Sequence, residues 1–374
     1  MTDLLTERSD CIDDGYDVVV VGGGPAGLSA ALALSRARRS VLVVDSGAPR
    51  NVSAGHVHNY LGQEGVAPGD LLAAGRAEVA GYGGAVVTGT VTGAKPVGAG
   101  QPGEGLRVML QDGQAVLARR LLVTAGLADE LPDVPGVAER WGRDVLHCPY
   151  CHGWEIRDQA LGVLGTGPMA VHQALLFRQW SPDVTLFLHI APDPTEEQWE
   201  QLTARDIEVV DSEVAALEVT DDRLSGVRLR SGQVFARQAV VVAPRFTARS
   251  DVLTSLGLTA VEERVGDYVI GSAVPADPTG ATVVPGVWVA GNVTDLRGQV
   301  ISSAAAGLHT GAAINADLIA EDTRRAVTAR RQHHEDREHR QPRLTIADAF
   351  SPQAERDTCE RVLGERRHGL ASAR

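Results

Sequence analysis

The first part of the chain alternates between apolar strands and a helical stretch. Residues 17–21 are apolar after the leading aspartate, which is typical of a strand buried on both faces of a parallel sheet, and they run directly into Gly22. The pattern then predicts a glycine-rich turn, a helix over 28–37 and a second buried strand over 40–44 that ends at Asp45. Together these segments predict one βαβ unit.

Short alternating runs follow between 84 and 123, separated by Gly- and Pro-rich turns, and predict a small antiparallel layer. Its expected strands cover 85–87, 106–110, 115–118 and 121–124. The stretch 131–136, which contains two prolines and a glycine, is expected to be a hinge.

Two later segments repeat and complete the first pattern. The pattern predicts a second βαβ start. It consists of a strand over 160–164, a glycine-rich turn over 165–167, a helix over 169–180 and a strand over 184–188. An apolar strand over 286–290 and a helix over 300–319 are expected to return to the first unit. The first domain would then be discontinuous and the second would be an insertion.

Composition narrows the function classes. The 374 residues are 44% apolar and 22% charged, which is typical of a soluble globular α/β protein with a large core. The formal net charge of −13 argues against general affinity for nucleic acid or anionic membranes, because both select basic surfaces. No apolar run reaches the ~18 residues that span a bilayer, and no basic segment precedes an apolar signal core, so a cytoplasmic protein is expected.

The glycines at 22, 24 and 27 carry a specific binding signal, because they follow a buried strand and open a helix. The first permits the tight turn, the second lets backbone N–H groups approach a pyrophosphate, and the third lets helix and strand pack closely. Asp45, at the end of the next strand, is placed to accept hydrogen bonds from ribose hydroxyls. An adenosine diphosphate moiety is therefore expected, against the alternative of a glycine turn without a ligand.

Four cysteines stand at 11, 148, 151 and 359, and only Cys148 and Cys151 are close in sequence. In a reducing compartment, such a C-x-x-C pair is more often redox-active or metal-binding than structural. A helix start lowers the pKa of a thiol toward neutrality, and His152, beside Cys151, suits general-base work. The alternatives are an inert turn and a zinc site, which would need about four ligands although no second C-x-x-C exists. We expect no metal.

A second glycine-rich turn, with Gly165, Gly167 and Ala170, also follows a strand and opens a helix, so a second dinucleotide site is available. The next strand runs into 189–192, where there is neither an acid for a ribose 2′-hydroxyl nor an arginine cluster for a 2′-phosphate. We therefore expect NADP(H) binding to be lost or weakened at this turn.

In this order, the motifs resemble the low-molecular-weight thioredoxin reductase family over about residues 16–320. The resemblance rests on the first glycine-rich turn, the C-x-x-C pair in a central inserted domain, and the closing segments 290–293 and 297–300. It implies FAD as the cofactor, because a dinucleotide held along its length needs a second loop at its ribityl part. We also expect a homodimer.

The chain departs from thioredoxin reductases at three places. His152 stands where an acidic residue usually follows the second cysteine, the basic motif for the NADPH phosphate is absent near 189, and Asn292 stands where aspartate is usual. These departures resemble the flavin dithiol oxidases that close disulfides in small natural products such as gliotoxin and holomycin. That resemblance implies that Cys148 exchanges with the substrate, Cys151 faces the flavin, His152 acts as base and O2 accepts the electrons.

The resemblance also divides the chain and implies its site residues. We expect an α/β fold with two Rossmann-like three-layer (ββα/βαβ) nucleotide-binding domains of thioredoxin reductase type. The expected parts are a flexible leader over 1–15, an FAD-binding domain over 16–128 and 247–320, an inserted redox and vestigial NAD(P)-binding domain over 129–246, and a charged helical tail over 321–374. The expected catalytic residues are Cys148, Cys151 and His152. The expected cofactor-binding residues are Gly22, Gly24, Pro25, Ala26, Gly27, Asp45, Ser46, Asn51, Ala125, Gly126, Gly291, Asn292, Gln299 and Val300.

The expected function is that of an FAD-dependent oxidoreductase acting on sulfur groups. As a dithiol oxidase it would close a disulfide in a small, natural-product-like dithiol and pass the electrons to O2. One alternative is an NADPH-dependent thioredoxin or disulfide reductase that uses the same cysteines in reverse. A second is a flavin redox sensor that does not turn over and whose tail contacts a partner. No nucleic acid or membrane partner is expected.

Overall fold

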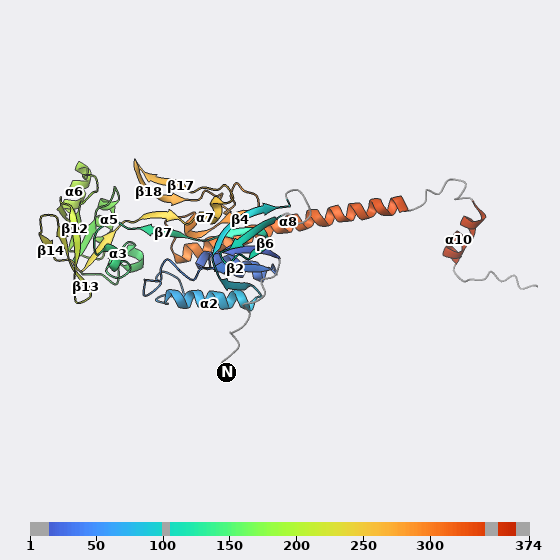
Figure 1. Cartoon of the computed structure of the whole chain (residues 1–374), viewed down its shortest axis with the longest axis horizontal. Coiled ribbons are helices and arrows are strands. Elements are labelled where there is room, and N and C mark those ends of the chain that lie inside the picture. The colour runs from blue at the N-terminus through green and yellow to red at the C-terminus, as the bar shows by residue number, and fades with distance from the viewer. Residues whose placement is uncertain (1–14, 99–104, 341–350, 364–374) are drawn as a thin grey trace, which may run out of the picture. The chain divides into compact units, whose positions relative to one another are not determined.

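The computed structural model describes residues 15–98, 105–340 and 351–363 (Figure 1). Nearly all of the predicted leader over 1–15, including Cys11, and part of the predicted tail therefore lie outside the described residues. The protein divides into two compact units, Met1–Ala316 and Asp317–Arg374, and the site lies in the first. Among the described residues, no helix is both long and apolar enough to cross a membrane.

A seven-stranded sheet carries the first glycine-rich turn. Its order is β3-β2-β1-β6-β5-β4, and β19 also pairs with β6. The pairs among β1, β2, β3, β6 and β19 are parallel, whereas β4, β5 and β6 form an antiparallel meander. The strand bounds are β1 Gly15–Val21, β2 Val41–Asp45, β3 Ala85–Thr88, β4 Val91–Val97, β5 Gly105–Leu110, β6 Ala115–Val123 and β19 Val287–Val289.

Helix α1 (Pro25–Arg36) connects β1 to β2 and packs against α2 (Pro68–Gly81). It begins three residues earlier than the predicted residue 28, because Gly24 caps it in an extended conformation and Pro25 occupies its first turn, where the N–H group that proline lacks is not needed. Helix α2 was not predicted.

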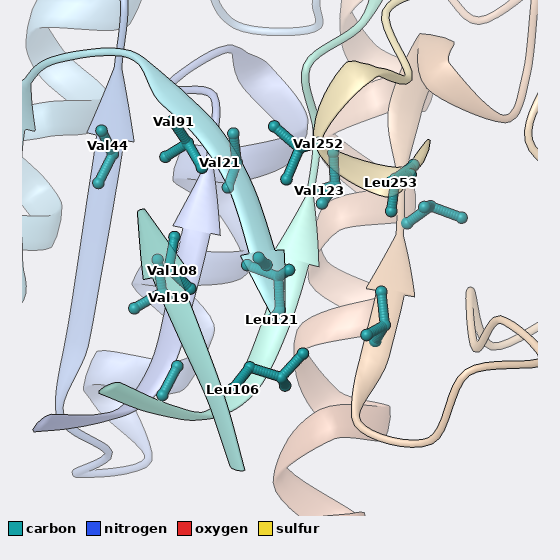
Figure 2. Packing of buried hydrophobic residues seen from close by; sticks show 14 of the residues in the cluster. Val19, Val21, Val44, Val91, Leu106, Val108, Leu121, Val123, Val252 and Leu253 are labelled. Carbon is teal, nitrogen blue, oxygen red and sulfur yellow. The ribbon is translucent and has the colours of Figure 1, made fainter. Parts of the chain in front are cut away.

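The core of this sheet consists of apolar side chains from its parallel strands and its meander (Figure 2). Val19 and Leu121, on neighbouring strands, are fully buried, and the short helix α7 (Asp251–Thr254) adds Val252 and Leu253 to the same cluster. The continuous burial of β1 and β2 is what their unbroken apolar runs predicted.

A second sheet lies in the segment between β7 and β16. It is five-stranded and parallel, in the order β11-β10-β9-β15-β8, and a three-stranded antiparallel sheet, β12-β13-β14, accompanies it. The strand bounds are β8 Val145–Leu146, β9 Leu161–Leu164, β10 Val184–Phe187, β11 Glu208–Val210, β12 Val214–Thr220, β13 Arg223–Leu229, β14 Val234–Phe235 and β15 Ala239–Val242. The helices are α3 Val137–Arg140, α4 Pro149–His152, α5 Ala170–Phe177 and α6 Glu196–Ala204.

Two short strands carry the chain between these sheets. β7 (Leu127–Glu130) follows β6 and pairs antiparallel with β16 (Arg245–Ala248), which follows β15 on the way back. The hairpin of β17 (Val261–Val265) and β18 (Tyr268–Ala273) extends them into a four-stranded sheet. β19 then pairs with β6, so the chain does return to the first sheet. The predicted domain limits stay a prediction.

Three expectations about secondary structure are wrong. The strands expected over 115–118 and 121–124 are one strand, β6, because its first residues pair with β5 while the rest pair with β1. β3 belongs to the parallel side of the sheet and not to an antiparallel layer. The break expected between the helix over 300–319 and the helical tail from 321 is absent, because both belong to α8 (Val300–Arg340) and the residues up to 340 hold no further Gly or Pro after Gly311. In the second unit, α10 (Pro352–Leu363) follows it.

Candidate active site

The first glycine-rich turn leaves no room for side chains at two of its glycines. Gly22 has a φ of 101°, and a Cβ atom there would lie 2.6 Å from the carbonyl oxygen of Thr124. A Cβ atom at Gly27 would overlap the carbonyl oxygen of Gly22, so this glycine lets α1 pack on the turn. Gly24, which caps α1, has no neighbour within 4 Å of its Cβ position. The positive end of α1 therefore faces open space that suits a pyrophosphate.

Asp45 joins this turn from the end of β2. Its Oδ1 atom accepts a hydrogen bond of 3.0 Å from the backbone N–H of Gly23. The bond holds the carboxylate beside the turn, which is the position from which the sequence predicts a contact with a ribose.

A cavity of about 1300 Å³ joins the first turn, the cysteine pair and the second turn. Every predicted site residue except Gly27 lines it, and Gly27 contributes by close packing instead. The residues that the structure brings together are Gly22, Gly24, Pro25, Ala26, Asp45, Ser46, Asn51, Ala125, Gly126, Cys148, Cys151, His152, Gly291, Asn292, Gln299 and Val300.

The lining of this cavity fits FAD. The first turn offers backbone N–H groups and a helix start for the diphosphate, and Asp45 offers a carboxylate for the ribose. The closing loop packs directly on this turn, because Gly291 has a φ of 75° and its Cβ position lies 2.9 Å from the Cβ atom of Ala26. A long dinucleotide would therefore meet both loops along its length.

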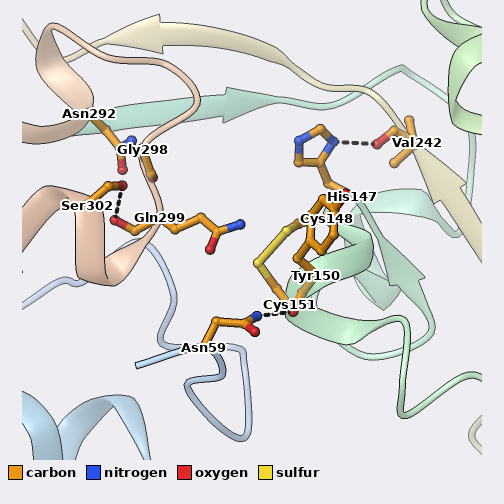
Figure 3. The surroundings of a disulfide bond; sticks show 10 residues. All are labelled: Asn59, His147, Cys148, Tyr150, Cys151, Val242, Asn292, Gly298, Gln299 and Ser302. Carbon is orange, nitrogen blue, oxygen red and sulfur yellow. Dashed lines mark hydrogen bonds between the residues drawn. A yellow bond between two sulfur atoms is a disulfide. The ribbon is translucent and has the colours of Figure 1, made fainter. Parts of the chain in front are cut away.

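Asn292 shapes the closing loop. Its Nδ2 atom donates hydrogen bonds of 2.8 Å to the carbonyl oxygens of Asp295 and Gly298. Both amide protons are thereby used, which leaves the side-chain oxygen as the group available to a cofactor. Gln299 follows in this loop, and Figure 3 shows its side chain pointing toward the cysteine pair.

Cys148 and Cys151 are joined as a disulfide, with 5.3 Å between their Cα atoms. Cys148 caps the four-residue helix α4, and its carbonyl oxygen accepts hydrogen bonds from the N–H groups of Cys151 and His152. Between the cysteines, Tyr150 packs edge-on against Trp180 with 5.9 Å between ring centroids. The redox pair is therefore held on a small, well-packed turn at the wall of the cavity.

His152 lines the cavity next to the disulfide. Burial lowers the pKa of His152 below its usual value, an effect that the Glu155 carboxylate opposes and His58 reinforces. The imidazole is therefore neutral near pH 7 and can accept a proton, as general-base work requires.

His147 is a site residue that sequence reasoning did not assign. It lines the cavity directly before Cys148, and its ring packs edge-on against Phe246 of β16 at 5.0 Å between centroids. Burial lowers the pKa of His147, so this ring is also neutral near pH 7. Its place next to the first cysteine was the one available signal.

Arg50 was also missed. Its guanidinium donates two hydrogen bonds to Asp129 of β7, at 2.8 and 2.6 Å, and lies 5.3 Å from the ring centroid of Phe246. No local pattern signals this pairing, because the two residues are 79 positions apart in the sequence.

The second glycine-rich turn keeps its shape, and residues 189–192 after the next strand hold neither an acid nor an arginine. A Cβ atom at Gly165 would lie 2.6 Å from the carbonyl oxygen of Leu188, whereas Gly167 faces open space. His189, which follows β10, accepts a hydrogen bond of 3.1 Å at Nδ1 from the N–H of Val214. Burial lowers the pKa of His189, so it offers no positive charge for a 2′-phosphate.

In the part of the chain that the structure describes, no group of three or more His, Cys, Asp or Glu could hold a metal ion. His56 and His58 line the cavity with 6.1 Å between their ring centroids. His58 pairs with Glu64 at 2.6 Å and with Glu155 at 3.5 Å, so carboxylates surround it.

Residues 16–311 match the family model described as pyridine nucleotide-disulphide oxidoreductase. The chain belongs to this family. It is 28% identical over 320 residues to the thioredoxin reductase sirT of Leptosphaeria maculans, across 82% of this chain and 95% of that protein. The predicted resemblance to thioredoxin reductases is therefore confirmed.

Solved structures support the same membership of the pyridine nucleotide-disulphide oxidoreductases. The crystal structure of HlmI is 47% identical with a TM-score of 0.78, across 86% of this chain and 98% of that one. An oxidoreductase from Agrobacterium tumefaciens is 35% identical with a TM-score of 0.75, across 82% of this chain and 99% of its own. The predicted fold class is confirmed, and the chain is an FAD-dependent oxidoreductase acting on sulfur groups.

Proposed function

We propose that this protein is a dithiol oxidase, which closes a disulfide in a small dithiol and passes the electrons to O2. One observation carries this direction of electron flow. The cysteine pair and the first glycine-rich turn line one cavity, whereas the second turn lacks the charges that would read NADPH. His189 is used by the backbone of Val214, and residues 190–192 are uncharged.

The resemblance to flavin dithiol oxidases implies the roles of the two cysteines. A substrate thiolate attacks the sulfur of Cys148, which forms a mixed disulfide and releases the thiolate of Cys151. The second substrate thiolate then attacks the substrate sulfur of this mixed disulfide, which closes the product disulfide and releases Cys148 as thiolate. His152 accepts a proton from the attacking thiol, because its ring is neutral.

The overall reaction is balanced as dithiol and O2 giving disulfide and hydrogen peroxide. FAD, which the first turn and the closing loop would hold, would supply the two-electron acceptor between the reduced cysteine pair and O2. The protein supplies the geometry: Cys151 and Gln299 both line the cavity, and Figure 3 shows the side chain of Gln299 pointing toward the cysteine pair.

The walls near the cysteine pair favour a small and largely apolar substrate. Besides several histidines and Gln173, the residues from α4, the second turn and α5 and the residue after His189 contribute apolar side chains, namely Tyr150, Pro168, Met169, Leu176, Phe177 and Ile190. Apolar walls with a limited set of placed polar groups are typical of small-molecule sites.

Anaerobic mixing tests the direction of electron flow. The purified yellow protein is mixed with dithiothreitol in one cell and with NADPH in another, and the visible absorption of the flavin is followed. The proposal expects rapid bleaching by the dithiol, reversed by air with formation of hydrogen peroxide. Rapid bleaching by NADPH and slow bleaching by the dithiol would contradict it.

An NADPH-dependent disulfide reductase is the second candidate. It is favoured by the second turn, where the open space at Gly167 and the tight packing at Gly165 are features of dinucleotide turns. The relatives named thioredoxin reductase point the same way. Bleaching by NADPH would select this candidate, and repeated turnover with O2 would exclude a redox sensor that does not turn over.

We also propose a homodimer in the cytoplasm. Helix α8 exposes Ile301, Ala305, Leu308 and Ala312, whose spacing places them on one side of the helix, and a second copy would cover this stripe. A single catalytic disulfide among four cysteines is compatible with a reducing compartment, where the few disulfides are usually transient and catalytic. Sedimentation equilibrium with a Leu308→Lys variant tests the dimer, which should dissociate.

A further inference from the structure

We propose that residues 50–64, which we call the clasp, position the redox helix α4 at the FAD cavity. The clasp follows β2 of the first sheet, but it contacts α4 and its flanks, which lie in the segment between β7 and β16. The inference rests on the proposed electron transfer between the cysteine pair and FAD, and it does not depend on O2 as the acceptor.

Asn59 makes the most direct contact. Its Nδ2 atom donates a hydrogen bond of 2.5 Å to the carbonyl oxygen of Tyr150, one of the two residues between the cysteines (Figure 3). Asn59 has a φ of 60°, a left-handed conformation that asparagine and glycine adopt more readily than other residues, and its N–H donates to Glu64 at 2.8 Å. The loop thus presents the amide to α4 from a fixed backbone.

His58 makes a second contact from the same turn. Its Nδ1 atom lies 2.6 Å from Glu64 within the clasp, and its Nε2 atom lies 3.5 Å from Glu155, just after α4. The hydrogen bond from His58 lowers the pKa of Glu64, so that carboxylate is ionised at neutral pH. His58 therefore links Glu64 of the clasp to Glu155, which follows α4.

The start of the clasp is anchored independently. Arg50 forms its two hydrogen bonds with Asp129 in β7. Ser53 lies so close to Gly142 that a Cβ atom at Gly142 would overlap its side chain. The clasp is therefore fixed at Arg50 and Ser53, and it reaches α4 and the residues after it through His58 and Asn59.

The clasp contacts are few, polar and outside both hydrophobic cores. Losing them should leave both sheets folded while α4 becomes freer to move against the cavity. Because a displacement of about 1 Å in a reacting group can slow a reaction ~10²-fold, a small change in α4 would be measurable. Asn59 and His58 are accordingly positioning residues that act through the disulfide.

The test compares Asn59→Gly with the control Asp206→Gly. Both substitutions replace a residue with a left-handed backbone by glycine, since Asp206 has a φ of 53°, but Asp206 follows α6 and its N–H donates to the carbonyl oxygen of Thr203 instead of to α4. In FAD-free protein we expect amide hydrogen exchange over 148–155 to be at least about fivefold faster in Asn59→Gly and unchanged in the control. In the FAD-loaded protein we expect anaerobic bleaching by dithiothreitol to be about tenfold slower.

His58→Gln serves as a second variant that keeps a polar side chain. It should show the same two effects at smaller size, and it decides the question if circular dichroism shows that Asn59→Gly does not fold. If amide exchange over 148–155 and the rate of bleaching in both variants equal those of Asp206→Gly, the proposed positioning role of the clasp is wrong. If wild-type protein is not bleached by dithiols at all, the proposed function fails, while the exchange measurement still decides the clasp.

Discussion

The Nδ1 atom of His147 lies 3.3 Å from the carbonyl oxygen of Val242, the last residue of β15. A carbonyl oxygen only accepts, so the contact places the proton of the neutral ring on Nδ1 and leaves Nε2 as an acceptor. His147 thereby ties the segment that leads into Cys148 to the end of β15 in the second sheet.

His147→Phe should lower the free energy of unfolding by about 1–3 kcal/mol, because it keeps an aromatic ring next to Phe246 but removes the donor to Val242. Urea unfolding of the FAD-free protein measures the change. His309→Phe, at an exposed position of α8, is the control and should change stability by less than about 0.5 kcal/mol. Equal changes in both variants would show that the hydrogen bond of His147 contributes little.

Cys151→Ser should stop flavin reduction by dithiols, because the exchange step then has no second sulfur to release. Stopped-flow absorbance under nitrogen measures the rate. The matched control is Cys359→Ser, since Cys359 is a free and exposed cysteine of α10. A wild-type rate in Cys151→Ser would remove the disulfide from the mechanism.

His152→Ala should slow flavin reduction about 10²-fold or more, as expected for the loss of a general base. Because burial lowers the pKa of His152, its neutral form persists below the usual histidine value of ~6.5. The wild-type rate should therefore fall only in acid below that value, and the variant should lose this acidic limb. An unchanged pH profile would assign the base role elsewhere, and His309→Ala controls for loss of a histidine.

Gly24→Val should abolish FAD binding without unfolding the protein, because the new side chain enters the open space before α1. Gly27→Ala should instead lower the Tm of the FAD-free protein, because its Cβ atom would overlap the carbonyl oxygen of Gly22 and lie 2.7 Å from the Thr124 hydroxyl. Flavin absorbance after gel filtration and thermal unfolding separate the two effects. FAD bound normally by Gly24→Val would place the diphosphate away from α1.

Local patterns were sufficient for the two glycine-rich turns and the strands that lead into them. Val18, Val19 and Val20 are fully buried, and a run of this kind has no other place than the centre of a parallel sheet. The closing loop at Gly291 was assigned to the site through the family resemblance, because its contact with Ala26 joins distant parts of the chain.

The contacts around the cysteine pair could not be predicted in this way. Asn59 and Tyr150 are 91 positions apart, and Arg50 and Asp129 are 79 apart, so no helix or strand period relates them. Long-range polar pairs depend on how the two sheets face each other, which the hydrophobic pattern does not encode. The continuity of α8 across residue 320 was missed for a simpler reason, because the charged residues that begin there suggested a separate tail.

The pairing of Glu130 with Arg245 in β7 and β16 has a consequence for how such proteins diversify. The segment between these residues leaves and re-enters the four-stranded sheet at neighbouring positions, so its two ends lie side by side. Recombination at these two neighbouring positions could exchange one cysteine-bearing segment for another and leave the first sheet, with its glycine-rich turn, unaltered. New sulfur chemistry would then be acquired without rebuilding the cofactor site.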